Sequence, residues 1–379
     1  MRQPPGFVKN PNLVCKLLRS IYGLKQSGVI WHNLLKTTIL ENSSYTQSNY
    51  DPCLFFADNN NLILIYVDDI LFMGENKLMK EKIRKRFTTH ELGEINQFLN
   101  VEFNRTEDTI VIKQEKFVKQ ILSKYGFLNC TPKQVPLTKE ENYSNISLPN
   151  NIKYIEIIGS LIYLATVSRP DIAFSVIYLA RQSSNPSEHH WNQVKHLLAY
   201  LKGTSTEGLT FSRTHDANLS GYCDSDYAGD PNSGKSTSGT IVFHGNNPIS
   251  WKSSLQSRIA LSSFEAEYYA LTELTKDLTY YSHMVKETSI QNKWPIEIRI
   301  DNQSAISIAN SPQEKFSNKT KHISTKYHFV KKEIQNGKIK LTHVPSAENL
   351  ADILTKVLPR PQFIKLDRTL RGDDKPCTQ

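Results

Sequence analysis

The sequence predicts an α+β or mixed α/β protein, and three stretches of its 379 residues carry that prediction. An apolar run over residues 62–73, interrupted by Asp68 and Asp69, is typical of two strands joined by a tight turn. Residues 154–203 contain apolar side chains at helical spacing. From about residue 209, strand-like and helix-like segments follow in the order βββ-α-β-α-α-β-α, which favours a mixed sheet with helices packed on it.

Two basic helices are expected after the hairpin. Met79, Ile83 and Phe87 recur every four residues behind Asn76, a good N-cap residue. A second helix has the same spacing over residues 117–125. Lysine and arginine side chains fill the opposite faces at 80–86 and 116–124, where each face is either a phosphate-binding surface or an ordinary solvated one.

The middle of the chain is predicted to be a linker followed by helices. Residues 131–151 are polar and contain three prolines, which is typical of a linker. The first helix is expected over residues 154–166, and a second begins after Ser168. Ser187 is expected to start a third helix, which Gly203 closes.

The last part of the chain returns to strands. The predicted strands are 219–223, 240–244, 249–251, 296–300 and 339–344, and the predicted helices are 262–287, 302–310, 325–335 and one from Glu348. Residues 359–379 are expected to form a polar tail.

Composition narrows the class of protein. The formal net charge of +9 and pI near 9.1 fit a polyanionic partner without proving one. The five cysteines are scattered and lack zinc or redox spacing, which favours free thiols in a reducing compartment. No apolar stretch reaches the ~18 residues of a membrane span, and no secretory leader is recognised. The sequence thus predicts a protein that is neither secreted nor membrane-bound.

Two sets of carboxylates are candidates for chemistry. Asp68 and Asp69 at the hairpin tip either share a metal ion or form an ordinary solvated turn. The second set lies in the last part of the chain: Asp224, Asp226, Glu265, Glu267, Asp301 and Asp352. Acids converging from separate elements could hold two Mg²⁺ or Mn²⁺ ions about 4 Å apart for phosphodiester hydrolysis. Taken singly, each acid is better explained as a cap or a surface charge.

Several motifs, in order, resemble the Pol polyprotein of copia-type LTR retrotransposons. The reverse-transcriptase-like motifs are QPPGF at 3–7, SIYGLKQS at 20–27 and YVDD at 66–69. GSLIYL at 159–164 and TVSRPDI at 166–172 resemble the connecting region of that family. The motifs GYCDSDYAGD at 221–230, SSFEAEY at 262–268, DNQSA at 301–305 and NLADILTK at 349–356 resemble its RNase H domain.

The resemblance implies roles for individual residues. Tyr66, Asp68 and Asp69 match the polymerase metal box, and Gln26 ends the segment that shapes the dNTP and template site. The residues that match the RNase H acids, which cut RNA in an RNA–DNA hybrid, are Asp224, Glu265, Asp301 and Asp352, with Asp226 as a rival to Asp224. The implied metal is Mg²⁺ or Mn²⁺.

One departure concerns polymerisation. In this family another catalytic Asp precedes the QPPG segment, and residue 1 lies just before that segment. Since phosphoryl transfer depends on metal positioning, we expect no DNA polymerisation by this chain alone.

The domains expected from the resemblance are a truncated reverse transcriptase with palm remnant and thumb-like helices (1–136), a linker and helical connection (137–208), an RNase H-like domain (209–358) and the tail. The expected partners are an RNA–DNA hybrid or template–primer and other retrotransposon Pol or Gag chains. Cytoplasmic virus-like particles and the nucleus are the expected compartments. The alternatives are a non-catalytic nucleic-acid-binding remnant, a degenerate open reading frame, or a general DNA nuclease.

Overall fold

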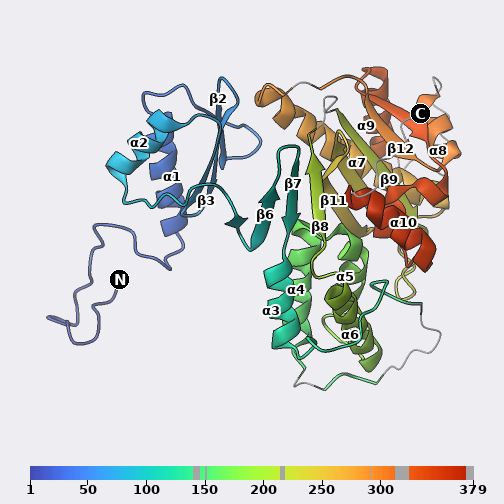
Figure 1. Cartoon of the computed structure of the whole chain (residues 1–379), viewed down its shortest axis with the longest axis horizontal. Helices are drawn as coiled ribbons and strands as arrows, with labels where there is room; N and C mark the ends of the chain where they lie inside the picture. The colour runs from blue at the N-terminus through green and yellow to red at the C-terminus, as the bar shows by residue number, and fades with distance from the viewer. Residues whose placement is uncertain (140–145, 150–151, 214–217, 291, 312–323, 373–379) are drawn as a thin grey trace. The chain divides into compact units, whose positions relative to one another are not determined.

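The structure is a computed structural model that describes residues 1–139, 146–149, 152–213, 218–290, 292–311 and 324–372. The chain divides into two compact units (Figure 1). Unit 1 comprises residues 1–92 and 283–290, and unit 2 comprises residues 93–282 and 291–379. The first unit boundary therefore lies well before residue 136, where the sequence analysis placed the end of its first domain.

Unit 1 contains a four-stranded antiparallel sheet and two helices. Its elements are α1 (Ser27–Leu40), β1 (Thr46–Gln47), β2 (Leu54–Ala57), β3 (Asn61–Tyr66), β4 (Asp69–Met73) and α2 (Lys77–Arg86). The strand order is β1-β2-β3-β4. Its buried core consists of Leu35, Ile39, Phe55, Ile63, Ile65, Met79 and Ile83.

The predicted hairpin is confirmed, with Tyr66 opposite Asp69 at its tip. Asn76 precedes α2 as predicted, but its side chain makes no capping hydrogen bond. Instead its amide donates to the carbonyl oxygen of Met73, which ties the helix start to the end of β4.

Unit 2 begins with a small sheet that the sequence analysis did not predict. Its strands are β5 (Gln97–Phe98), β6 (Val101–Arg105), β7 (Thr109–Lys113) and β8 (Gly208–Ser212), all paired antiparallel. One of the two partners of β7, strand β8, lies nearly a hundred residues further along the chain, so the local sequence pattern does not predict this pairing. The predicted boundary between residues 208 and 209 lies inside β8.

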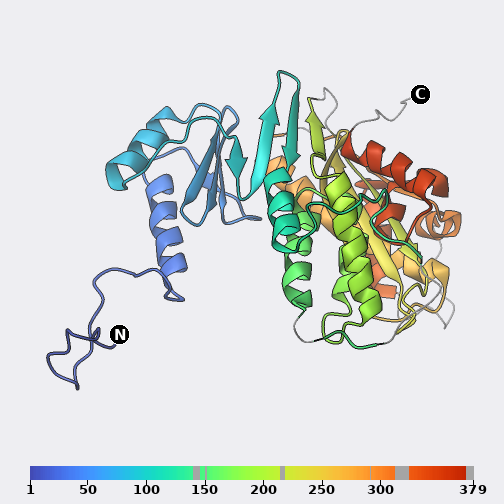
Figure 2. The ribbon, with the colours of Figure 1, turned by 60° about the horizontal axis from the view of Figure 1, so that its bottom comes forward.

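Helices follow this sheet: α3 (Glu115–Lys124), α4 (Tyr154–Val167), the 3₁₀ turn η1 (Pro170–Ile172), α5 (Ala173–Ala180) and α6 (Glu188–Gly203). Figures 1 and 2 show α4, α5 and α6 gathered side by side. Ser187 caps α6 reciprocally with His190, as a helix start at Ser187 requires. Ser168 is not a cap, because its hydroxyl donates to Gln114 Oε1. Within the predicted linker, residues 140–145 and 150–151 lie outside the described residues.

The second sheet of unit 2 has five strands: β9 (Leu219–Asp226), β10 (Thr237–His244), β11 (Asn247–Leu255), β12 (Ile296–Ile300) and β13 (Ile339–His343). Their order is β11-β10-β9-β12-β13. The β11-β10-β9 pairs are antiparallel, whereas β9-β12-β13 pair in parallel. The mixed sheet predicted for this part of the chain is confirmed.

The remaining elements are α7 (Ser263–Glu287), α8 (Gln303–Asn310), α9 (Ser324–Gln335), η3 (Ser346–Glu348), η4 (Leu350–Leu354) and α10 (Arg360–Arg371). The helix predicted from Glu348 is thus a pair of 3₁₀ turns. Residues 360–371 form a helix where a polar tail was predicted. Phe363, Leu366 and Leu370 of α10 are buried, because their spacing gives this charged helix one apolar face.

One hydrophobic core runs through the helices and the larger sheet of unit 2. It joins buried side chains of α3 to α6 with those of η4 and α10 and with Ile241 and Phe243 of β10. The connecting helices and the five-stranded sheet are therefore packed as one body. Among the described residues, no helix is long and apolar enough to cross a membrane.

Candidate active site

Three aspartates from separate elements of unit 2 converge at one edge of the five-stranded sheet. Asp224 lies in β9, Asp301 follows β12 directly, and Asp352 lies in η4. One carboxylate oxygen of each lies within 4.8 Å of one oxygen of both others. Asp224 and Asp352 are buried, and Asp301 is half-buried. Such a group of oxygen ligands suits a hard divalent cation.

The sheet topology explains why Asp224 and Asp301 meet. β9 and β12 are parallel neighbours, so their carboxyl ends lie at the same edge of the sheet. Asp352 reaches this edge because η4 packs closely on β10 at Gly239, which lies opposite Asp224. A Cβ atom at Gly239 would lie 2.7 Å from Thr355 Cγ2 and 2.8 Å from the Ala351 carbonyl oxygen. A glycine is thus required for this approach.

Neighbouring side chains hold the aspartates. The Thr355 hydroxyl donates to Asp224 Oδ2 at 2.5 Å, and the Ser346 hydroxyl donates to Asp301 Oδ2 at 2.6 Å. The ammonium of Lys356 lies 3.1 Å from Asp352 Oδ1 and 3.5 Å from Asp224 Oδ2. One ammonium therefore lies between two carboxylates of the group.

The two glutamates of α7 have different surroundings. Glu265 Oε2 accepts a hydrogen bond from the Leu261 N–H at 2.7 Å, and the Glu265 N–H donates to the Ser262 hydroxyl. This is a capping contact of the S-x-x-E type at the start of a helix. Glu267 lies two residues further on, which places it on a different side of the helix.

Glu267, rather than Glu265, is directed toward the aspartates. Burial, together with the charges of Asp224 and Asp301, raises the pKa of Glu267 well above its usual value. Its Oε1 accepts from the Ser225 N–H at 3.3 Å, while its buried Oε2 has no hydrogen-bond partner among the described residues. The assignment of Glu265 to the acid group is therefore corrected: the structure gives that residue a capping role. The S-x-x-E pattern at 262–265 is the sequence signal for that role.

The acids of this site are short of positive charge. Burial and the neighbouring charge of Asp224 raise the pKa of Asp352 to about 7. Burial would lower the pKa of Lys356, but the carboxylates of Asp224 and Asp352 outweigh it and raise that pKa. Both shifts have one origin, an excess of carboxylates in a poorly solvated place.

Asp226, the rival of Asp224, is not part of the three-acid group. It ends β9 opposite Thr237, and burial raises its pKa. Its position two residues beyond Asp224 leaves Asp224 as the acid that faces Asp301 and Asp352.

The hairpin candidates lie in unit 1. Asp68 and Asp69 are exposed at the turn, and Tyr66 has 51% of its surface exposed. The indole N–H of Trp31 in α1 donates to the Val67 carbonyl oxygen at 2.6 Å, and this hydrogen bond holds the turn to α1. Gln26 is exposed just before α1. In the described part of the chain, neither aspartate joins a group of three or more metal-ligating side chains.

The two predicted basic helices form as α2 and α3, and the helix predicted over 325–335 forms as α9, but several of their cations have partners within the chain. Lys80 and Arg84 both pair with Glu91, and Lys124 pairs with Glu156. In α9, the ammonium of Lys326 lies 3.4 Å from the ring centroid of Tyr269. Part of the basic charge of these helices is therefore already neutralised within the chain.

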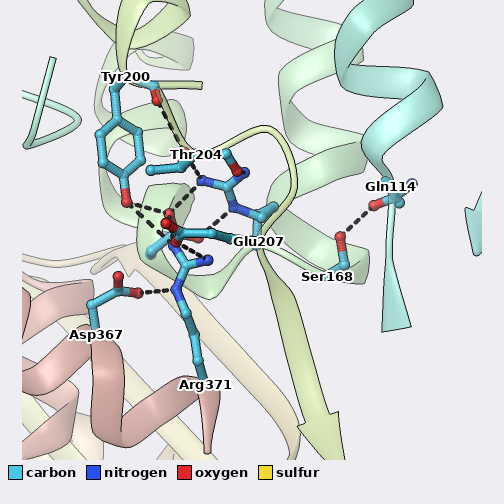
Figure 3. Close-up of polar contacts among 9 residues, drawn as sticks. Gln114, Ser168, Tyr200, Thr204, Glu207, Asp367 and Arg371 are labelled. Carbon is cyan, nitrogen blue, oxygen red and sulfur yellow. Dashed lines mark hydrogen bonds and ion pairs between the residues drawn. The ribbon is translucent and has the colours of Figure 1, made fainter. Parts of the chain in front are cut away.

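A second group of charged side chains, all buried except that of Glu207, lies away from the acids, where α10 packs on η1 and α6 (Figure 3). Arg169 donates to both carboxylate oxygens of Asp171 at 2.9 and 2.8 Å. Asp171 also accepts from the Tyr200 hydroxyl at 2.7 Å and from Arg371 at 2.9 Å. Arg371 in turn donates to Asp367 at 2.7 Å and forms an ion pair with Glu207 at 2.5 Å. We call these six residues the buried ion network.

The pKa values within the buried ion network follow from its two guanidinium groups. Burial alone would raise the pKa of Asp171, but Arg169 and Arg371 hold it below its usual value. Among the described residues the ion-pair partner of Asp367 is Arg371, and burial with the nearby charge of Asp171 raises the pKa of Asp367 to about 6. Every charged member has a partner of opposite charge, so the network fits a structural role.

The sequence of the chain is similar to that of known proteins. Residues 1–139 match the family described as reverse transcriptase (RNA-dependent DNA polymerase). Over 384 residues the chain is 34% identical to the retrovirus-related Pol polyprotein from transposon TNT 1-94 of Nicotiana tabacum, covering 96% of this chain and 28% of that protein. The chain spans about a quarter of the length of the curated relatives it matches first.

Two solved structures are also similar to the chain. LC11-RNase H1, isolated from compost by a metagenomic approach, has a TM-score of 0.30 and 20% identity, covering 37% of this chain and 93% of that one. The foamy viral protease-reverse transcriptase, solved in complex with dsDNA, has a TM-score of 0.41 and 14% identity, covering 86% of this chain and 60% of that one.

Proposed function

The chain belongs to the Pol polyprotein family of copia-type retrotransposons, and from that premise we propose that unit 2 is a ribonuclease H that cleaves the RNA strand of an RNA–DNA hybrid. The observation that supports this most directly is the convergence of Asp224, Asp301 and Asp352 at the carboxyl ends of parallel strands, with Glu267 beside them. Acids in this arrangement suit hydrolysis of a phosphodiester assisted by divalent cations.

The site residues fit a divalent cation on grounds beyond their charge. Glu267 is 7% exposed, and its Oε2 has no hydrogen-bond partner among the described residues. An orphaned carboxylate oxygen in a buried place is costly unless a cation compensates it. The proposed ligands are therefore Asp224, Glu267, Asp301 and Asp352, with Mg²⁺ or Mn²⁺ as the ion.

A bound divalent cation would supply activation of a water molecule and stabilisation of the leaving oxygen. The chain itself contributes the positions of the ligands. Thr355 and Ser346 each direct one carboxylate by a hydrogen bond, and Gly239 admits η4 against the sheet. These contacts hold the acids in place before substrate arrives, which lowers the cost of organising the site.

The proposed partner is an RNA–DNA hybrid, bound through its phosphates. Binding should weaken steeply with salt because each neutralised phosphate releases counterions. Other Pol or Gag chains of the same element are further proposed partners, and cytoplasmic virus-like particles and the nucleus are the proposed compartments.

The proposal does not extend to DNA polymerisation. The hairpin carboxylates Asp68 and Asp69 are exposed, and no third acid gathers with them among the described residues. A polymerase site has to fix its metal ions between triphosphate and primer.

The test is cleavage of a labelled RNA–DNA hybrid by the purified chain with Mg²⁺ or Mn²⁺. Asp301→Asn should lower the cleavage rate roughly 100-fold or more while hybrid binding stays largely intact. The matched control is Asp108→Asn, an exposed site in the turn between β6 and β7, which should cleave like the wild type.

Three outcomes would contradict the proposal. Undiminished cleavage by Asp301→Asn would show that the site is elsewhere. Binding without cleavage, in a sample shown to be folded, would favour a non-catalytic nucleic-acid-binding protein. Cleavage of duplex DNA at least as fast as hybrid would indicate a general nuclease. Primer extension by the same sample would contradict the exclusion of polymerisation.

A further inference from the structure

Lys356 is the only positively charged side chain with an ion pair to the three-aspartate group among the described residues. Its ammonium lies 3.1 Å from Asp352 Oδ1 and 3.5 Å from Asp224 Oδ2. It also exerts a favourable charge interaction on Asp226 and Glu267. One lysine therefore pairs with two carboxylates, and its charge also acts on two more.

The place of Lys356 in the chain lets it reach these acids and also leave them. It follows Thr355, the C-cap residue of η4, so the segment that carries Asp352 also carries its counter-charge. About a third of its side chain is exposed, at 35%. A lysine has a flexible stem and a compact charge, so its ammonium can move into solvent without disturbing the backbone.

An ammonium and a divalent cation compete for the same oxygens. A cation bound by Asp224 and Asp352 would have to displace the Lys356 ammonium or accept a like charge within a few ångströms. Both cases weaken the binding of the ion. In the metal-free protein, the same ammonium reduces the repulsion among the carboxylates.

We propose that Lys356 is an internal counter-cation of the acid site: it holds the carboxylates together in the metal-free protein and sets the affinity of the site for divalent cations by competing with them. It is a positioning residue, since it acts through the carboxylates. The inference rests on the proposed function, because it takes the acids as the metal ligands.

The experiment titrates Mn²⁺ into the full chain by isothermal calorimetry, without nucleic acid. Lys356→Met keeps the length and apolar stem of the side chain but removes its charge, and should bind Mn²⁺ about tenfold more tightly than the wild type. The same variant should melt at a lower temperature in EDTA. Lys356→Arg keeps the charge and should bind Mn²⁺ within about threefold of the wild type.

Lys365→Met is the control for a general loss of charge. It removes an exposed lysine of α10 in the same unit and should leave the affinity within about twofold of the wild type, because exposed charges are screened. Should Lys356→Met fail to fold, Lys356→Gln is expected to give the same gain in affinity.

The two proposals fail differently. Equal or weaker Mn²⁺ binding by both neutral variants, while the wild type binds, would overturn the counter-cation role alone. Absence of Mn²⁺ binding by a folded wild type would overturn the proposed function, and this inference with it.

Discussion

Unit 2 buries two groups of charged side chains, and they are built in opposite ways. The buried ion network combines the carboxylates of Asp171, Asp367 and Glu207 with two guanidinium groups. The acid site combines four carboxylates with one ammonium, that of Lys356. In the network each carboxylate contacts a guanidinium group, whereas in the acid site an excess of negative charge remains.

The difference separates a structural use of charge from a functional one. Buried charges are tolerated when paired and hydrogen-bonded, and the network satisfies that condition internally. The acid site does not satisfy it, which agrees with our proposal that this site binds a divalent cation. Removing Asp171, the carboxylate that two guanidinium groups share, should therefore lower stability, whereas removing Asp352 from the acid site should raise it.

The largest expected effect is the loss of Asp171. Asp171→Asn removes the charge that Arg169 and Arg371 share, so the buried Arg169 loses its acidic partner while Arg371 keeps its ion pairs with Asp367 and Glu207. We expect the free energy of unfolding to fall by about 3–5 kcal/mol in metal-free buffer. Urea unfolding followed by circular dichroism measures this, with Asp108→Asn as an exposed control that should change it by less than about 0.5 kcal/mol. A loss as small as that of the control would mean that the network does not support the fold.

A smaller loss is expected where the acid site depends on close packing. Gly239→Ala places a methyl group against Thr355 and the Ala351 carbonyl, and should cost about 1–3 kcal/mol. Because η4 carries Asp352, Mn²⁺ binding should weaken as well. Gly159→Ala in α4 is the control, since nothing lies within 4 Å of the added Cβ, and it should not destabilise the protein. Unimpaired Mn²⁺ affinity in Gly239→Ala would show that the close packing of η4 on β10 is not needed to position Asp352.

The acid site should respond to Asp352→Asn by a gain in metal-free stability. The pKa of Asp352 is raised to about 7 in the folded chain, so its contribution is present below the unfolded pKa and is lost as pH rises through 7. Asparagine has no such loss, and at pH 8 in EDTA the variant should be about 1–2 kcal/mol more stable. Thermal melts with and without Mn²⁺ would also show that the ion no longer stabilises the variant. If Asp352→Asn were less stable than the wild type in EDTA, the two sites would respond alike to the loss of a carboxylate, and the proposed difference between them would be wrong.

The smallest expected effect is that of Asp367→Asn, which compares a carboxylate paired with one guanidinium group with Asp171, which is shared by two. Burial raises the pKa of Asp367 to about 6, so its stabilising contribution is full below about pH 4 and is lost as pH rises through 6. Asp367→Asn lacks that loss, and its stability relative to the wild type should rise by about 1 kcal/mol between pH 4 and 7. Urea midpoints across that range measure the effect. Parallel curves for the two proteins would mean that Arg371 fully compensates Asp367.

The sequence predicted the larger sheet well because its strands carry local signals. The run at 296–300 alternates apolar and charged residues, and Asp301 follows it at the end where parallel strands open. Asn302 caps the next helix by accepting from the Ala305 N–H. Local pattern and tertiary position agree in this part of the chain, and the convergence of three predicted aspartates follows.

Tertiary context decided what the local pattern left open. Glu265 and Glu267 both fit a helix, and only the packing of α7 on the sheet determines which of them faces Asp224 and Asp301. The pairing of β7 with β8 joins segments far apart in the sequence. The sequence of α10 is typical of a polar tail, and its apolar face is recognised only from its packing in the core of unit 2. Each case depends on a neighbour distant in sequence.

The shared core of unit 2 restricts how the part that carries the acid site can be separated from the rest of the chain. A fragment beginning at residue 209 would lack β7, the strand that pairs with β8. It would also uncover apolar side chains of β10, η4 and α10 that share a core with α4, α5 and α6. Exposed strand edges and apolar faces favour self-association. A fragment that keeps the acid site folded would therefore have to include the connecting helices, so the smallest separable module is larger than the five-stranded sheet.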